Sequence, residues 1–218
     1  MLEIRKMTKS YLTPRGRRYI FRDMSLTVPP GKNIGLIGRN GSGKSTLMRL
    51  ISGADTPDSG RIITDRSISW PVGLSGGFQG SLTGRDNVKF VCRVYGAVGD
   101  DMRAKVAFVQ DFAEIGSYFD EPVKTYSSGM RSRLAFGLSM AFDFDYYLID
   151  EVMAVGDANF KKKSGEIFRK KLVDSKLILV THSMSEVSKL CDVVLYLANG
   201  EVTVYDDVQE GIKRYLGK

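Results

Sequence analysis

A glycine-rich stretch, residues 38–45, carries the clearest chemical pattern in this chain. It fits the phosphate-binding loop G-x-x-x-x-G-K-[ST] without a mismatch. An apolar run at 34–37 leads into it and a helix-like run at 46–51 leads out, which is the strand–loop–helix setting that the motif requires. Glycines let backbone N–H groups turn onto phosphate oxygens, and the helix behind adds the positive end of its dipole. The candidate phosphate ligands are Gly38, Arg39, Asn40, Gly41, Ser42, Gly43, Lys44, Ser45 and Thr46.

Two residues of the loop, together with two carboxylates further along the chain, could form a nucleotide-hydrolysing site. Lys44 can reach the β- and γ-phosphates, and the Ser45 hydroxyl suits a Mg²⁺ ion. An apolar run at 147–149 ends in Asp150, which can hold Mg²⁺, and Glu151, which is placed to polarise the attacking water. Taken alone, an apolar run followed by two carboxylates is a weak signal. Downstream of a complete phosphate loop it favours catalysis.

His182 is the single histidine, and it follows the apolar run 177–180. A lone histidine is usually a structural residue. At the end of a strand that neighbours the one ending in Asp150, its imidazole can donate to a γ-phosphate oxygen or hold the attacking water in line. We therefore expect a catalytic role.

The elements that must position these residues follow from apolar patterning. Alternation at 2–7 and the run 19–28 predict two N-terminal strands separated by a polar loop at 13–18. Strands are also predicted at 33–37, 61–64, 67–70, 146–149, 177–180 and 193–197, and a helix at 44–52. From residue 83 to about 140 the pattern is helical, with helix bodies at 87–95, 101–112 and 132–141. Near-continuous apolar strands separated by helices predict a mainly parallel sheet covered on both faces.

Composition narrows the class of protein. The 218 residues are 43% hydrophobic and 26% charged, as in ordinary globular proteins, and no apolar run approaches the ~18 residues of a membrane span. The N-terminus lacks a signal-peptide pattern, so we expect the protein to stay in the cytosol. Cys92 and Cys191 have no metal-ligand spacing and are predicted to be buried apolar groups. The net charge of +7 favours polyanionic partners or an anionic membrane surface. Because the basic residues are spread along the chain, no nucleic-acid role is predicted.

The order of these motifs resembles that of ATP-binding cassette (ABC) ATPases over essentially the whole chain. The most specific part is residues 126–131, which are similar to the ABC signature L-S-G-G-Q, with Tyr126, Ser128 and Met130 in place of its Leu, first Gly and Gln. The resemblance implies an α/β P-loop NTPase core with a mainly parallel sheet, an N-terminal antiparallel β portion and a helical insert. It places the core at about 1–78 and 137–218 and the helical subdomain at about 79–136.

The resemblance also implies site roles, with ATP and Mg²⁺ as cofactors and composite sites in a homodimer. Ser127 or Ser128, with Gly129, would close on the γ-phosphate held by a second copy. Gln79 would reach the Mg²⁺ and water region, joining Ser45 and Asp150 at the metal, and Asp157 would cross the dimer interface. Tyr11 would stack on adenine, with Tyr19 as the alternative.

Three segments, residues 68–73, 76–87 and 126–130, together narrow the resemblance to the ATP-binding subunits of bacterial capsular polysaccharide exporters of the polysialic-acid type. This implies a peripheral protein on the cytoplasmic face of the inner membrane, which works with a polytopic membrane subunit and a polysaccharide cargo. An ABC ATPase for O-antigen or teichoic acid, or a soluble non-transport ABC ATPase, stays open. A P-loop GTPase would need the motif Asn-Lys-x-Asp, which the sequence lacks.

Overall fold

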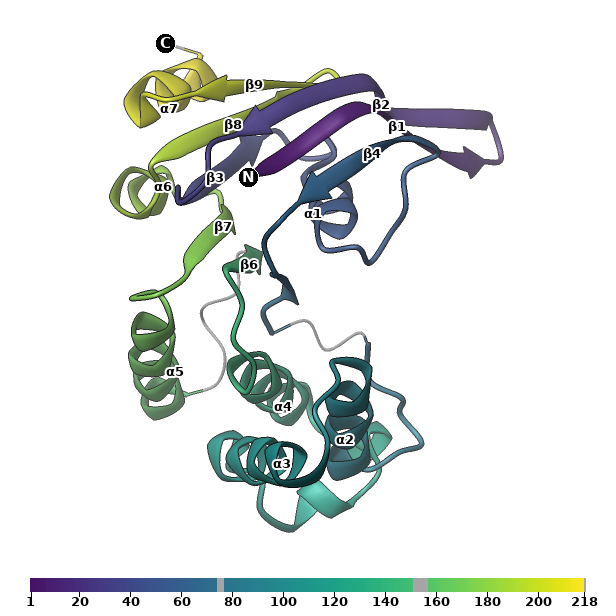
Figure 1. The fold of residues 1–218 in the computed structure, drawn as a ribbon, viewed down its shortest axis with the longest axis vertical. Coiled ribbons are helices and arrows are strands. Elements are labelled where there is room, and N and C mark those ends of the chain that lie inside the picture. Colours follow the sequence, from purple (N-terminus) through teal and green to yellow (C-terminus); the bar gives the residue numbers. More distant parts are fainter. Residues whose placement is uncertain (74–76, 151–156, 218) are drawn as a thin grey trace. The chain divides into compact units, whose positions relative to one another are not determined.

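The computed structural model describes residues 1–73, 77–150 and 157–217 (Figure 1). The chain divides into two compact units, and each is described by itself. Unit 1 comprises residues 1–71, 144–151 and 174–218, and unit 2 comprises residues 72–143 and 152–173. Within the described ranges, none of the helices combines the length and the apolar character needed to cross a membrane.

Unit 1 contains two sheets among the described residues. The antiparallel sheet has the order β2-β1-β4 and the larger sheet the order β5-β6-β7-β3-β8-β9. The strands of the first are β1 Leu2–Thr13, β2 Gly16–Val28 and β4 Ser59–Thr64. Those of the second are β3 Ile34–Gly38, β5 Ile68–Pro71, β6 Tyr146–Asp150, β7 Lys176–Val180, β8 Val193–Ala198 and β9 Glu201–Tyr205. All pairings in the second sheet are parallel except β8 with β9.

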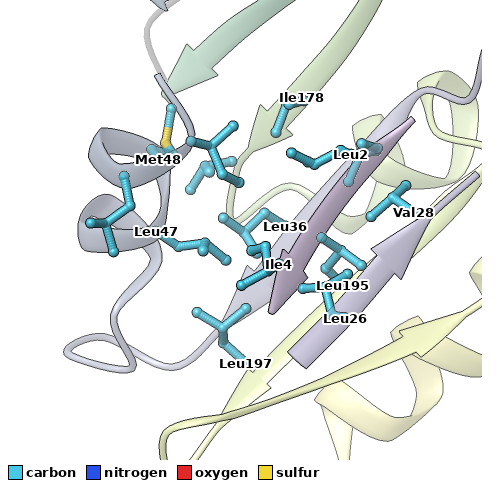
Figure 2. Packing of buried hydrophobic residues seen from close by; sticks show 14 of the residues in the cluster. Leu2, Ile4, Leu26, Val28, Leu36, Leu47, Met48, Ile178, Leu195 and Leu197 are labelled. Carbon is cyan, nitrogen blue, oxygen red and sulfur yellow. The ribbon is translucent and has the colours of Figure 1, made fainter. Parts of the chain in front are cut away.

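The core of unit 1 joins the two sheets to α1, Lys44–Ile51. Figure 2 shows Leu47 and Met48 of α1 in the same buried cluster as Ile4 of β1 and Leu36 of β3, and all four side chains are at most 1% exposed. Burying this apolar surface, at roughly 25 cal/mol per Å², holds β3 and α1 together. The loop between them is thereby anchored at both ends. The remaining helices of unit 1 are α6 Met184–Leu190 and α7 Val208–Leu216.

Unit 2 is helical among the described residues. It contains α2 Gly84–Val94, α3 Gly99–Ala113, α4 Ser128–Met140 and α5 Ala158–Lys171, with short 3₁₀ turns η2 Gly116–Asp120 and η3 Val123–Thr125. Phe112 stacks on Phe136 with ring centroids 5.8 Å apart and meets Phe160 edge-on at 5.3 Å, so that one aromatic cluster joins α3, α4 and α5. Unit 2 is larger than the predicted insert 79–136, because it takes in α5 and all of α4.

The predicted fold class is confirmed, including the mainly parallel sheet and the antiparallel N-terminal portion. Both cysteines are buried, as predicted. The predicted polar loop at 13–18 is too long. Backbone pairing continues through Tyr11 with Arg18 to Thr13 with Gly16, which leaves a two-residue turn. The exposed arginines of β2 lack the apolar alternation by which a strand is recognised, so the sequence did not indicate that the hairpin reaches so far.

Candidate functional site

The phosphate loop lies between β3 and α1, and close packing requires glycine at two of its positions, Gly38 and Gly43. A Cβ at Gly38 would lie 2.5 Å from the Leu197 carbonyl oxygen. Gly43 has φ of +106° and precedes α1, and a Cβ there would meet Ile20 at 2.7 Å and Phe21 at 3.0 Å. The loop backbone therefore approaches β8 at Gly38 and β2 at Gly43 so closely that neither position has room for a side chain. The predicted strand–loop–helix setting is therefore present.

Two polar side chains of the loop fit a bound polyphosphate. The Lys44 ammonium, 9% exposed, donates to the carbonyl oxygens of Gly38 at 2.8 Å and Arg39 at 3.2 Å. Among the described residues, the buried Ser42 hydroxyl has no hydrogen-bond partner. A buried hydroxyl left unpaired is costly, and a phosphate oxygen would satisfy it. The loop thus supplies a cation and a donor to an anion at α1's N-terminus.

A cavity of about 520 Å³ brings the loop together with the two strand-end residues predicted from the sequence. It is lined by Arg18, Ile20, Asn40, Gly41, Gly43, Lys44, Ser45, Thr46, Asp150, Val180 and His182. Asp150 ends β6 and pairs in register with Val180 of β7, which accounts for its position beside the residues after β7. The Ser45 hydroxyl and the Asp150 carboxylate are the oxygen ligands that Mg²⁺ prefers, so these residues fit the metal.

A hydrogen-bonded turn holds His182 at the cavity. The Thr181 hydroxyl donates to Glu186 at 3.0 Å and accepts from the Ser183 backbone N–H at 3.0 Å. The Ser183 side chain then caps α6 by accepting from the Glu186 backbone N–H at 3.4 Å. Residues on both sides of His182 are thereby fixed, while His182 itself is exposed at the cavity.

In unit 2, the side chain of Asn87 forms two hydrogen bonds with the backbone of Gln79. Its N–H donates to Asn87 Oδ1 at 2.8 Å, and its carbonyl accepts from Asn87 Nδ2 at 3.1 Å. Asn87 lies in α2, is 4% exposed and also donates to the Thr83 carbonyl at 2.9 Å. Asn87 therefore fixes the segment that carries Gln79. The sequence-based prediction noted Asn87 only as part of a helix start and missed this role.

The signature residues of the sequence form the N-terminus of α4. Ser127 is the N-cap and its hydroxyl accepts from the Met130 backbone N–H at 3.2 Å. Ser128 and Gly129 occupy the first turn, and a Cβ at Gly129 would meet only Ser127 Oγ, at 3.8 Å. Tyr126, the residue before this N-cap, is 3% exposed, and its hydroxyl donates to the Tyr118 carbonyl at 2.6 Å. The helix start is thus rigidly held and open at Gly129, as an anion-binding terminus requires.

Asp157 is the N-cap of α5. Its pKa lies below the ordinary value because the Phe160 backbone N–H donates to the carboxylate and the Arg133 guanidinium lies beside it. Arg133 lies in α4, the helix that begins with the signature residues and is called the signature helix below. Its Nη2 is 2.5 Å from Asp157 Oδ2, so this ion pair connects α5 to the signature helix.

Glu151, the predicted general base, lies outside the described residues.

The two candidate adenine-stacking tyrosines lie in different surroundings. The Tyr11 hydroxyl donates to Asp55 at 2.8 Å and accepts from Arg49 at 3.0 Å, at the C-terminal part of α1. Tyr19 lines a second cavity, of about 540 Å³, together with residues of the phosphate loop. The structure therefore brings Tyr19 to the loop, whereas Tyr11 belongs to a polar cluster beside it.

Comparison with known proteins supports the assignment. Residues 21–154 match the family model described as ABC transporter. A polysialic acid transport ATP-binding protein, KpsT of Escherichia coli, is 60% identical over 99% of this chain and 98% of its own length. The capsule polysaccharide export ATP-binding protein CtrD of Neisseria meningitidis serogroup B is 47% identical with the same coverage of both chains.

Solved structures agree on the fold. The ATP-binding cassette MJ0796, in a dimeric post-hydrolysis state bound to ADP and Pi, superposes with a TM-score of 0.72 at 21% identity, over 94% of this chain and 98% of that one. At this identity the likeness concerns the fold alone. The family match and the near-full-length relatives carry the family assignment: this chain belongs to the ABC transporter family, as an ATP-binding subunit.

Proposed function

We propose that this chain is the ATP-hydrolysing subunit of an exporter of capsular polysaccharide. The observation that carries the proposal is one cavity, which joins the phosphate loop to Asp150 and His182. These groups surround the place where a γ-phosphate would lie if the polyphosphate follows the loop. The relatives at 47% and 60% identity, named for capsule polysaccharide export and polysialic acid transport, support the cargo class.

The residues assigned to the site have distinct tasks in this proposal. Backbone N–H groups of the loop and the Lys44 ammonium bind the β- and γ-phosphates, and the Ser42 hydroxyl donates to one of their oxygens. Ser45 and Asp150, with Gln79, would hold Mg²⁺, which when bound neutralises phosphate charge. Glu151 takes a proton from the attacking water, and His182 orients that water or donates to the γ-phosphate.

A second copy of the chain completes each site in this proposal. The N-terminus of α4, with Ser127, Ser128 and Gly129, offers backbone and hydroxyl donors to an anion. These donors would close on the γ-phosphate held by the partner. Closure of two copies over two ATP molecules would provide the motion that drives a separate membrane subunit. We place that assembly at the cytoplasmic face of the bacterial inner membrane, on the roles named for the relatives.

O-antigen and teichoic acid exporters are the second candidate class. An O-antigen export ATP-binding protein of Myxococcus xanthus is 42% identical over 83% of this chain, and a teichoic acids export protein of Bacillus anthracis is 37% identical over 90%. This chain covers 42% and 36% of those proteins, whereas it covers 98% of KpsT and CtrD. An O-antigen export ATP-binding protein of Klebsiella pneumoniae, RfbB, is covered to 82% of its length but is only 35% identical. Sequence identity therefore favours the capsular class.

Hydrolysis of ATP by the purified chain tests the enzymatic part. Lys44→Ala should abolish hydrolysis and weaken nucleotide binding, since each charge-assisted phosphate bond contributes roughly 1.5–3 kcal/mol. Lys213→Ala, which removes an exposed lysine of α7, serves as a matched control. Phosphate release and the thermal unfolding midpoint are measured together. Near-normal turnover in a folded Lys44→Ala protein would remove this loop from the active site.

A further inference from the structure

The hairpin formed by β1 and β2 projects beyond the third strand of its sheet. β4 pairs with β1 only as far as Thr8, whereas the pairing of β1 with β2 continues to Thr13 and Gly16. Figure 1 shows this end of the hairpin extending past β4. In the part of the chain that the structure describes, the two strands therefore pair only with each other at this end. We refer to residues 12–17 below as the hairpin tip.

A tight turn fixes the shape of the hairpin tip. The Thr13 hydroxyl donates to the Gly16 carbonyl oxygen at 2.7 Å and accepts from the Arg15 backbone N–H at 3.3 Å. The ring of Pro14 fixes its own φ, and Gly16 has φ of +104°, a conformation that favours glycine. The backbone of the tip is thereby held in one conformation, so that binding a partner costs little loss of conformational freedom.

The hairpin carries positive charge that is not balanced within it. Residues 9–22 contain no carboxylate and five cationic side chains, namely Lys9, Arg15, Arg17, Arg18 and Arg22. Lys9 is buried and paired with Asp55, whereas the four arginines are exposed. Within the hairpin tip, Arg17 lies 4.0 Å from the Asp58 carboxylate, and Arg15 has no ion-pair partner among the described residues. The tip therefore presents a positive surface that attracts polyanions.

An exposed leucine adds an apolar group to this charged surface. Leu12 is 81% exposed, more than any other large hydrophobic side chain of the described residues. It pairs directly with Arg17 across the hairpin, and directly opposed residues of an antiparallel pair lie on the same face. Residues 13–18 also line a further hollow, of about 540 Å³. A leucine beside guanidinium groups is the combination that suits the interface of an anionic bilayer.

We propose that the hairpin tip contacts the anionic lipid headgroups of the membrane at which the transporter works. The guanidinium groups of Arg15 and Arg17 bind headgroup phosphates through paired donors, and Leu12 enters the boundary with the acyl chains. A soluble acidic polymer would satisfy the arginines but would leave Leu12 in water, so the exposed leucine favours the bilayer. The proposal takes the membrane location from the proposed function and goes beyond it, because it gives the ATP-binding subunit a lipid contact of its own.

Vesicle flotation tests this contact. The purified full-length chain is mixed with vesicles of phosphatidylcholine, or of phosphatidylcholine and phosphatidylglycerol. The wild type should bind only the vesicles that contain phosphatidylglycerol, and less at high salt. The variant Arg15→Ala/Arg17→Ala should bind them more weakly by roughly five-fold for each arginine removed. Leu12→Ala should weaken binding roughly three- to ten-fold, since less apolar surface leaves water.

Matched controls come from the α5 region. Arg169→Ala/Lys170→Ala removes the same net charge from two exposed positions, and Val173→Ala shortens an apolar side chain that is 76% exposed. Both controls should bind the vesicles as the wild type does. Equal thermal unfolding midpoints confirm that all variants are folded. ATP hydrolysis without vesicles should be unchanged in the tip variants, because the changed side chains lie outside the phosphate cavity.

The outcomes separate this contact from the proposed function. No binding of the wild type to anionic vesicles would overturn the contact, and equal weakening by the α5 double variant would mean that net charge alone is measured. Wild-type binding by Leu12→Ala would point to a soluble polyanion instead of a bilayer, and would also overturn the proposal. A wild-type chain that floats with the vesicles but does not hydrolyse ATP would overturn the proposed function while leaving the lipid contact intact.

Discussion

At the scale of single residues, Tyr11 and Tyr19, the two candidates for stacking on adenine, differ in their surroundings. The Tyr11 hydroxyl is engaged by Asp55 and Arg49, and the Lys9 ammonium lies 5.0 Å from its ring centroid. Tyr19 is 40% exposed and lines the cavity of about 540 Å³ beside the phosphate loop, with the Arg22 guanidinium 3.9 Å from its ring centroid. A cation thus lies over each of the two rings, whereas Tyr19 shares a cavity with the phosphate loop, and on this ground we propose Tyr19 as the residue that stacks on the base.

We predict that Tyr19→Ala weakens nucleotide binding more than Tyr11→Ala does. Removing a base-stacking ring costs about 1–3 kcal/mol of binding free energy. The loss should appear with a slowly hydrolysed ATP analogue, which carries the base, but not with inorganic tripolyphosphate, which carries the phosphates alone. Calorimetric titration of the two variants side by side makes the comparison. The reverse order of affinities would return the stacking role to Tyr11, as the family resemblance implied.

At the scale of elements, the contact of Asn87 with Gln79 links α2 to the segment predicted to reach the metal and water region. We predict that Asn87→Asp lowers ATP turnover more than nucleotide affinity. The change removes the amide donors to the Gln79 and Thr83 carbonyls, while each carbonyl keeps a backbone hydrogen bond, from the N–H groups of Leu82 and Asn87. Losing a hydrogen bond of this kind costs about 0.5–1.5 kcal/mol of unfolding free energy.

The control for Asn87 is Arg93→Gln, a change at an exposed position of the same helix. Steady-state hydrolysis, analogue affinity and denaturant unfolding are compared for both variants. If Asn87→Asp hydrolyses ATP at the wild-type rate despite a lowered unfolding free energy, the position of Gln79 does not limit the reaction.

The strands and the phosphate loop could be predicted because their signals are local. Glycines at 38, 41 and 43 and the apolar runs around them lie within one short segment, so a single stretch of sequence contains the whole argument. The cavity that contains Tyr19 could not be predicted in this way. It joins β2, the loop, the β8–β9 turn and α7, and the packing that unites them depends on contacts between residues distant in the chain, such as Gly38 with Leu197 and Gly200 with Ile20. The strand β9 and the helix α7 were likewise absent from the sequence-based prediction.

At the scale of the whole molecule, the account requires two copies to form one working enzyme. We predict that Gly129→Asp binds the ATP analogue normally and does not hydrolyse ATP. A carboxylate at this position would face the γ-phosphate held by the partner, where like charges repel. The surrounding space accepts a side chain, since the nearest atom to a Cβ is Ser127 Oγ at 3.8 Å, so the helix itself should form.

A matched control and a mixing experiment make this prediction specific. Gly165→Asp places the same carboxylate on α5, at another helical glycine with nothing within 4 Å of its Cβ, and should hydrolyse ATP. Mixing Gly129→Asp with Lys44→Ala should restore part of the activity, because a heterodimer pairs one intact phosphate loop with one intact signature helix. If Gly129→Asp alone abolished analogue binding, the cross-subunit role would be refuted.

The location of the capsular polymer tests the central claim most directly. In the bacterium that carries this gene, the chromosomal copy is replaced by Lys44→Ala, with Lys213→Ala as the control, and both proteins are checked for equal abundance. Surface and intracellular polymer are then measured separately. The account predicts that the Lys44→Ala strain still synthesises the polymer but retains it inside the cell, while the control strain displays it normally. Normal surface polymer in the Lys44→Ala strain, at wild-type protein abundance, would contradict the assignment to export.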